Sequence, residues 1–198
     1  LRERLARSAE RHQWFPAPLD LAPAGGPLAA LAEPHPLVRA PARLIADDPA
    51  KIAGAEPRPG PFLFELLSGA REVVDIESAY LILPAASVEV LAGLVARGVR
   101  VRVLTNSLAT NDVVAAHAGY LGTRTALLEA GVELYELRPE GRPGPERGVR
   151  PPASSRASLH SKAVVVDRER LFVGSMNLDP RSIEINTEIG VFVANGEL

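Results

Sequence analysis

Apolar and polar positions along the chain change their period from one segment to the next, and this pattern predicts the helices and strands. Apolar residues between 61 and 68 repeat at helical spacing, and Gly69 follows them as a stop signal. The next predicted elements are strand, helix, strand, helix and strand, over residues 72–83, 88–97, 99–104, 111–130 and 132–137. Such alternation favours parallel strands with helices packed on the sheet. We therefore predict an α/β fold with a mixed, mainly parallel sheet flanked by helices.

The last part of the chain is richer in predicted strand. Strands are expected at 161–166, 171–175 and 185–194, with a tight hairpin turn at 167–170 between the first two. Between them and the alternating part, residues 138–158 hold many Pro, Gly and Arg, which predicts a mobile basic loop.

Residues 1–60 are dense in proline and glycine and predict a connecting segment or insertion. A short helix at 1–12 and a short strand at 38–46 are the elements expected there, and Asp47-Asp48-Pro49 then turns the chain. Residues 61–198 form the predicted catalytic lobe. Because the sequence starts at Leu1 instead of Met and stops abruptly, we expect a fragment of a longer protein.

Composition narrows the possible functions. The 198 residues are 46% hydrophobic, carry a formal net charge of −2 and include no cysteine. This excludes wholesale disorder, a disulfide scaffold and a thiolate zinc site, and it makes nucleic acid an unexpected partner. Of the 22 basic residues only two, Lys51 and Lys162, are lysine, so the use of lysine instead of arginine at these positions needs an explanation.

One motif near the C-terminus carries the candidate chemistry. It reads His160-x-Lys162-x₄-Asp167-x₆-Gly174-Ser175-x-Asn177. His160 and Lys162 are two apart on a predicted strand, so their side chains share one face. Asn177 on the returning strand can sit beside them across the sheet.

These residue types suit a reaction at phosphorus. Lys162, Ser175 and Asn177 can bind phosphate oxygens that gain negative charge. The imidazole of His160 can attack phosphorus or protonate a leaving oxygen, and Glu188 on the next predicted strand could hold the imidazole tautomer. The arrangement needs no metal, and we expect no cofactor.

The motif resembles that of the phospholipase D superfamily. Upstream segments are similar to bacterial cardiolipin synthases of the C-type branch, namely IADDPAK (45–51), DIESAYLILP (75–84), VRVLTNSLATNDVVAAHAGY (101–120) and LLEAGVELYELRP (127–139). The resemblance covers about residues 38–195. It implies a phospholipase D-like fold and a phosphatidyltransferase or phospholipase activity.

In that family two such motifs meet in one active site. One histidine forms a covalent phospho-histidine, and the other protonates the leaving alcohol and then activates the incoming alcohol or water. The present chain carries one motif, whose position implies the second lobe and makes His160 the expected general acid. The resemblance assigns catalytic roles to Lys162, Asn177 and Glu188, while Asp167 is expected to be more structural than chemical.

Further residues are candidates for substrate binding. Gly174 would let a group approach the backbone closely, and Ser175 adds a hydroxyl. Asn106 and Ser107 follow a predicted strand at its carboxyl end, where open α/β folds build their sites. His117 lies in the next predicted helix.

The resemblance also implies partners. These are a phosphatidylglycerol-like phospholipid, an alcohol acceptor, a missing N-terminal lobe and the membrane surface, with the cytoplasmic face as the expected location. The loop at 138–156 has five Arg and two Glu, a net charge of +3, and could bind anionic lipid.

Two other functions stay open. With one motif per chain, the protein could be a metal-independent nuclease or phosphodiesterase that completes its site as a homodimer. It could also bind phospholipid without turnover, because one histidine cannot act on both sides of phosphorus. We expect the isolated chain to be inactive unless it pairs with a second lobe.

Overall fold

The computed structural model describes residues 40–111, 113–137 and 158–196. In chain order the helices and strands are β1 (Ala42–Ala46), η1 (Pro49–Ala53), α3 (Pro59–Ser68), β2 (Val73–Ser78), α4 (Ala85–Ala96), β3 (Arg100–Asn106), α5 (Val114–Glu129), β4 (Glu133–Leu137), β5 (Lys162–Val166), β6 (Arg170–Gly174), α6 (Pro180–Glu184) and β7 (Ile189–Ala194). The predicted helix at 1–12 and the basic loop at 138–156 lie outside the described residues.

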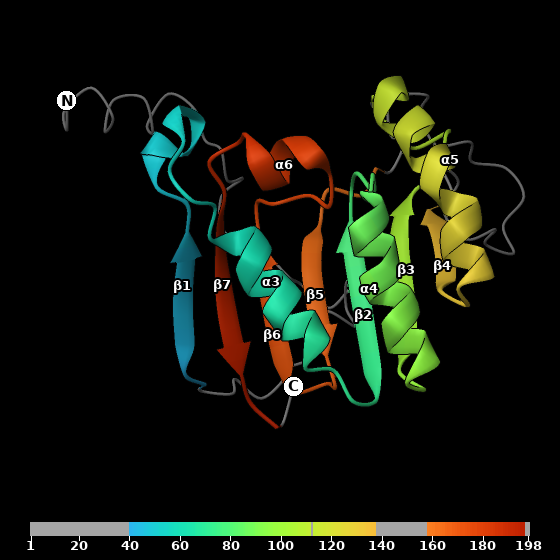
Figure 1. The fold of residues 1–198 in the computed structure, drawn as a ribbon, viewed down its shortest axis with the longest axis horizontal. Coiled ribbons are helices and arrows are strands. Elements are labelled where there is room, and N and C mark those ends of the chain that lie inside the picture. The colour runs from blue at the N-terminus through green and yellow to red at the C-terminus, as the bar shows by residue number, and fades with distance from the viewer. Residues whose placement is uncertain (1–39, 112, 138–157, 197–198) are drawn as a thin grey trace, which may run out of the picture. The chain divides into compact units, whose positions relative to one another are not determined.

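The seven strands of the described residues form one mixed sheet in the order β1-β7-β6-β5-β2-β3-β4, as Figure 1 shows. The predicted α/β class with a mixed, helix-flanked sheet is confirmed. The sheet is not mainly parallel, however, because among the described strand pairs β2–β3 and β3–β4 are parallel and the other four are antiparallel. The reason is that β5 and β6 form a hairpin, the segment with the short helix α6 then returns the chain so that β7 pairs antiparallel with β6, and β1 pairs antiparallel with β7.

The described residues form a compact unit that begins at Ala40, upstream of the predicted lobe boundary at residue 61. β1 belongs to this unit because it pairs with β7 along its whole length, from Ala42 opposite Val193 to Ala46 opposite Ile189. The short strand predicted at 38–46 is therefore present as β1, and it is an edge strand of the sheet.

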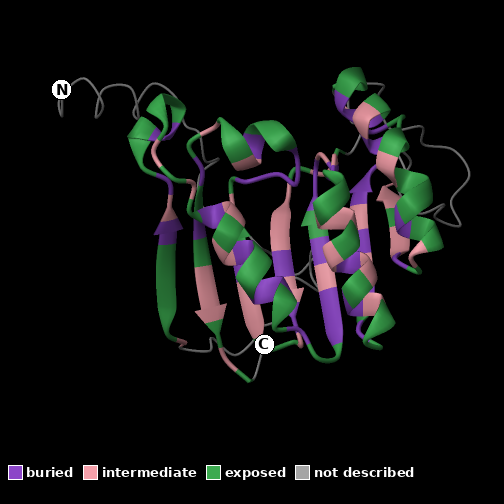
Figure 2. Cartoon of the chain, in the orientation of Figure 1, coloured by how far each residue is buried: buried purple, intermediate pink, exposed green. Residues whose placement is uncertain are grey.

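Three helices, α3, α4 and α5, cover one face of the sheet (Figure 1). Alternate residues of the central strands point into this layer, and Figure 2 shows the resulting buried band. The buried core includes Leu63, Leu66, Val74, Ile76, Leu91, Leu94, Val101, Val103, Val164, Val166 and Phe172. Among the described residues, no helix is long and apolar enough to cross a membrane.

Gly174 and Gly190 allow two neighbouring strands to approach each other. A Cβ atom on Gly174 would overlap the carbonyl oxygen of Ile189, and one on Gly190 would overlap the ring of Phe172. Gly174 was predicted to let a substrate group approach its backbone. In the structure the group that approaches is the backbone of β7, so packing of the sheet explains this glycine.

Two elements differ from the sequence prediction. β2 ends at Ser78 instead of residue 83, and Leu81 makes an isolated bridge to Leu178. α6 (Pro180–Glu184) lies between two predicted strands, where no element was expected, and β7 begins at Ile189 instead of residue 185. Asp179 caps α6 by accepting a hydrogen bond from the backbone N–H of Ser182 at 2.9 Å, and a proline follows the cap.

Candidate active site

Each of the seven strands in the described part of the chain has one end on the same side of the sheet, and this edge carries most of the predicted catalytic residues. β1, β2, β3, β4 and β6 end there, while β5 and β7 begin there. The register aligns them, because Ser78 pairs with Lys162 and Gly174 pairs with Gly190. In Figure 1 this edge lies at the top, beside η1 and α6.

His160 and Lys162 stand at the start of β5. His160 is exposed, and its carbonyl oxygen accepts a hydrogen bond of 2.7 Å from the Nζ atom of Lys162. Lys162 is half-buried and shares its side of the strand with the core residues Val164 and Val166. The ammonium group is therefore held next to the residue with which it is predicted to act.

Asn177 lies in the segment that leaves β6 at the same edge. The residue is only 8% exposed, and its Oδ1 atom is buried without a hydrogen-bond partner among the described residues. The next residue fixes the segment, since the N–H of Leu178 donates to the Ser78 hydroxyl at 3.0 Å. A buried amide with spare hydrogen-bonding capacity is suited to a ligand, because leaving it unpaired costs about 1–3 kcal/mol.

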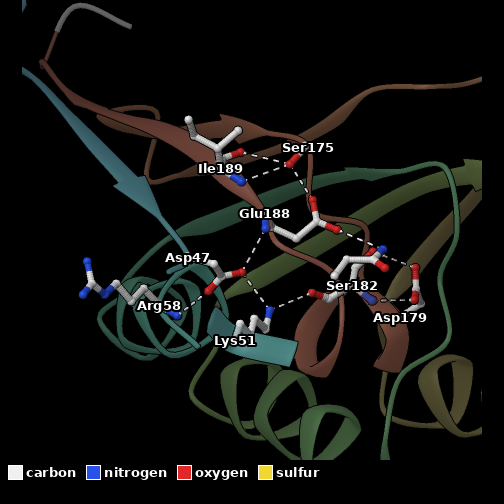
Figure 3. A network of polar contacts seen from close by, with 9 residues as sticks. Asp47, Lys51, Arg58, Ser175, Asp179, Ser182, Glu188 and Ile189 are labelled. Carbon is white, nitrogen blue, oxygen red and sulfur yellow. Dashed lines mark hydrogen bonds and ion pairs between the residues drawn. The ribbon is translucent and has the colours of Figure 1, made fainter. Parts of the chain in front are cut away.

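Glu188 immediately precedes β7 and is 5% exposed. Its carboxylate accepts hydrogen bonds from the Ser175 hydroxyl and from the Asn186 amide, the latter at 3.3 Å (Figure 3). Ser175 also accepts a hydrogen bond from the N–H of Ile189 at 3.0 Å. Ser175, predicted to bind substrate, thus holds Glu188. No hydrogen bond joins His160 to Glu188 among the described residues.

A buried ion pair behind Glu188 was not predicted. The Nζ atom of Lys51 lies 2.7 Å from Oδ2 of Asp47, and the two side chains are 1% and 0% exposed. Burial alone would raise the pKa of Asp47. The hydrogen bonds from Lys51 and from the backbone N–H groups of Arg58 and Glu188 instead hold that pKa below its ordinary value. The rarity of lysine in this chain was the sequence signal for this pair.

Asp167 lies at the opposite end of β5 from Lys162, about 16 Å away for five residues of strand. Its carboxylate accepts hydrogen bonds from the backbone N–H groups of Arg71, Glu72 and Val73 and from Arg170. The hairpin is therefore anchored to the start of β2 by this residue. The structural role expected for Asp167 agrees with this position.

Asp167→Asn is expected to destabilise the fold by about 2 kcal/mol without removing activity from the folded protein, because hydrogen bonds to a charged group are lost. Burial raises the pKa of Asp167, but its backbone donors and Arg170 hold it below the ordinary value of 3.8. The stabilisation is therefore complete above that value and is lost as the pH falls through the lowered pKa. Urea unfolding from pH 2 to 7 measures this. A variant with normal stability but no turnover would contradict the structural role.

Asn106 is placed differently from the prediction. The residue is 1% exposed, and its amide nitrogen donates to the carbonyl oxygens of Ala79 and Leu159 at 3.1 and 2.9 Å. Its Oδ1 atom accepts a hydrogen bond from the N–H of Leu159 at 2.8 Å. Asn106 therefore fixes the backbone immediately before His160, and its amide is occupied by this structural role.

Ser107 and His117 lie near the end of β3. The Ser107 hydroxyl is 3.1 Å from that of Thr110, so this contact shapes the loop. His117 is 6% exposed in the first turns of α5, with its ring centroid 5.7 Å from that of Tyr120. Its Nδ1 atom is buried without a partner among the described residues. Of the two, His117 keeps an unpaired atom that a substrate group could use.

Several known proteins are similar in sequence to much of this chain. A family model described as "Cardiolipin synthase, PLD-like domain" matches residues 63–198. Cardiolipin synthase C of Escherichia coli (strain K12) is 44% identical over 168 residues, which cover 82% of this chain and 35% of that protein. Cardiolipin synthase A of Pseudomonas aeruginosa (strain LESB58) is 32% identical over 130 residues, covering 66% of this chain and 23% of that protein. The chain thus spans about a third or less of these relatives.

Solved structures share the fold at low sequence identity. The phospholipase D family member Nuc from Salmonella typhimurium has a TM-score of 0.55 at 16% identity, over 80% of this chain and 86% of that one. Phosphatidylserine synthase from Haemophilus influenzae Rd KW20 has a TM-score of 0.56 at 16% identity, over 78% and 34% of the two chains. Since the family match covers well over half of its residues, the chain belongs to the cardiolipin synthase family with a phospholipase D-like domain.

Proposed function

We propose that this chain supplies one half of the active site of a phospholipid phosphatidyltransferase. The observation that carries the proposal is the convergence of His160, Lys162, Asn177 and Glu188 at one edge of the sheet, within a chain similar to cardiolipin synthases. The substrate is a phosphatidylglycerol-like lipid, and the acceptor is the hydroxyl group of an alcohol or of a second lipid.

In this proposal the reaction has two steps. A histidine of a second motif attacks phosphorus and forms the P–N bond of a phosphatidyl-histidine, while the P–O bond to the head group breaks. His160 gives its proton to the leaving alcohol oxygen. In the second step His160 takes a proton from the incoming alcohol, whose oxygen attacks phosphorus as the P–N bond breaks. Lys162 and Asn177 bind the phosphate oxygens throughout.

An apolar cavity supports a lipid substrate over a nucleic acid. About 280 Å³ of space lies between α3 and α4, bordered by apolar side chains of both helices. Met176 and Leu178, which flank Asn177, belong to its wall. An acyl chain entering there would extend from a phosphate held at Asn177. The near-neutral net charge of −2 gives nucleic acid no comparable attraction.

The test uses the full-length protein with phosphatidylglycerol vesicles and, in parallel, plasmid DNA, both without added metal. We expect cardiolipin or phosphatidate from the lipid and no cleavage of the DNA. Mass spectrometry of the lipid extract and gel electrophoresis of the plasmid read the two outcomes. Cleaved DNA with unchanged lipid would favour the alternative, a nuclease that completes its site as a homodimer.

A further inference from the structure

We propose that the buried pair Asp47–Lys51 is a positioning device that sets Glu188 for catalysis. The inference rests on the proposed function, in which Glu188 orients the imidazole of His160. Neither Asp47 nor Lys51 belongs to the H-x-K-x₄-D motif. Asp47 directly follows the edge strand β1, and Lys51 lies in the 3₁₀ helix η1.

Asp47 makes two hydrogen bonds with the main chain of Glu188. Its backbone N–H donates to the Glu188 carbonyl oxygen at 2.8 Å, and its Oδ2 atom accepts from the Glu188 N–H at 3.0 Å. Beyond the peptide, the Glu188 carboxylate is held by Ser175 and Asn186 (Figure 3). The main chain and the side chain of Glu188 are thus fixed by separate partners, and Asp47 is the one that fixes the main chain.

Lys51 connects Asp47 to the short helix α6. Its Nζ atom donates to Oδ2 of Asp47 at 2.7 Å and to the carbonyl oxygen of Ser182 in α6 at 3.2 Å. Ser182 in turn donates to Asp179, which begins that helix. α6 connects Asn177 to Glu188 along the chain. The buried ammonium group of Lys51 therefore fixes the segment that carries both Asn177, the proposed phosphate ligand, and Glu188, the proposed orienting carboxylate.

The choice of lysine fits this task. The described contacts offer the cation two oxygen acceptors in a site that is closed to solvent. An ammonium group has three N–H donors, of which these acceptors take two, whereas a guanidinium group has five in a fixed plane and would leave more buried donors unpaired. The chain uses arginine almost everywhere else, yet Lys51 and Lys162, its only two lysines, both stand at this edge of the sheet.

Stability of the fold alone does not explain why this ion pair is buried. An apolar pair of similar size is often as stable as a buried ion pair, because both charges must leave water. An apolar pair could not accept the hydrogen bonds that Asp47 receives from the N–H groups of Arg58 and Glu188. The carboxylate therefore supplies fixed geometry, and Lys51 neutralises the charge that this geometry requires.

A double-mutant cycle on the full-length protein tests the proposal. The variant Asp47→Asn/Lys51→Met removes both buried charges, and it is made in the wild-type and Glu188→Gln backgrounds. With phosphatidylglycerol vesicles, we expect kcat to fall about 10- to 100-fold in the wild-type background, since small misplacements of catalytic groups have effects of this size. In the Glu188→Gln background we expect no further loss. Equal losses in both backgrounds, or an unchanged kcat, would overturn the proposal.

A matched control is Arg100→Met, which breaks an exposed ion pair with Glu133 at the opposite edge of the sheet and should leave kcat unchanged. Hydrogen exchange of the peptide containing Glu188, measured without substrate, gives a readout independent of turnover. We expect faster exchange of this peptide in the double variant and unchanged exchange in β2 and β3. Unchanged exchange at Glu188 refutes the positioning role, whereas absent turnover by the wild type refutes only the proposed function.

Discussion

Replacing His160 with asparagine in the full-length protein is expected to lower kcat for phosphatidylglycerol by about 10²- to 10⁴-fold, the usual effect of losing a general acid–base group. The side chain is exposed, so no core contact is lost and the fold should be unaffected. Because asparagine cannot transfer the proton, the leaving alcohol would have to depart as an alkoxide. Initial rates of lipid product formation, with equal amounts of folded enzyme, measure the effect.

The neighbouring Ser161→Ala variant is the matched control for His160→Asn. Ser161 is adjacent in the chain, and residues next to each other on an extended segment point to opposite sides. We expect Ser161→Ala to keep nearly full activity. A His160→Asn protein that keeps more than about a tenth of the wild-type rate is incompatible with a general acid at this position.

Lys51→Met alone is expected to lower the free energy of unfolding by about 3–5 kcal/mol, because it leaves a buried carboxylate without its cation. That is a large share of the roughly 5–15 kcal/mol that stabilises a typical domain. The deficit should shrink as the pH falls. Without Lys51 the pKa of Asp47 rises above its value in the wild type, because only the backbone hydrogen bonds from Arg58 and Glu188 then oppose the effect of burial. Protonation at low pH removes the uncompensated charge. Urea unfolding at several pH values provides the measurement.

The neutral pair Asp47→Asn/Lys51→Met is the control for Lys51→Met. With both charges removed, the penalty for an isolated buried charge disappears, so most of the lost stability should return. If Lys51→Met is as stable as the wild type at neutral pH, or if the double variant is the less stable of the two, the pair is not the closed ion pair described here.

Much of the fold could be predicted from the sequence because period and stop signals are local. The helix ending at Gly69 and the strands at the centre of the sheet follow directly from apolar spacing. α6 was missed because five residues give too little periodicity to register, although Asp179 and Pro180 are a start signal. The antiparallel half of the sheet was underestimated because strand direction depends on tertiary pairing that local patterns do not carry.

The motif predicted where the site lies more accurately than it predicted the role of each side chain. The structure brings His160, Lys162, Asn177 and Glu188 to one edge, as their strand positions suggested. Gly174, Ser175 and Asn106 are at the same edge but serve packing or positioning. Such roles depend on neighbours distant in sequence, as when Asn106 holds the backbone of Leu159. Asp47 was interpreted only as a turn residue for the same reason.

The most direct test of the central claim is head-group exchange. Full-length protein is incubated with phosphatidylglycerol vesicles and isotopically labelled glycerol in the presence of a metal chelator. Transfer through a phosphatidyl-enzyme predicts that label enters phosphatidylglycerol, and that His160→Asn abolishes its entry. If no label is incorporated and no cardiolipin or phosphatidate forms, the protein does not transfer phosphatidyl groups as proposed.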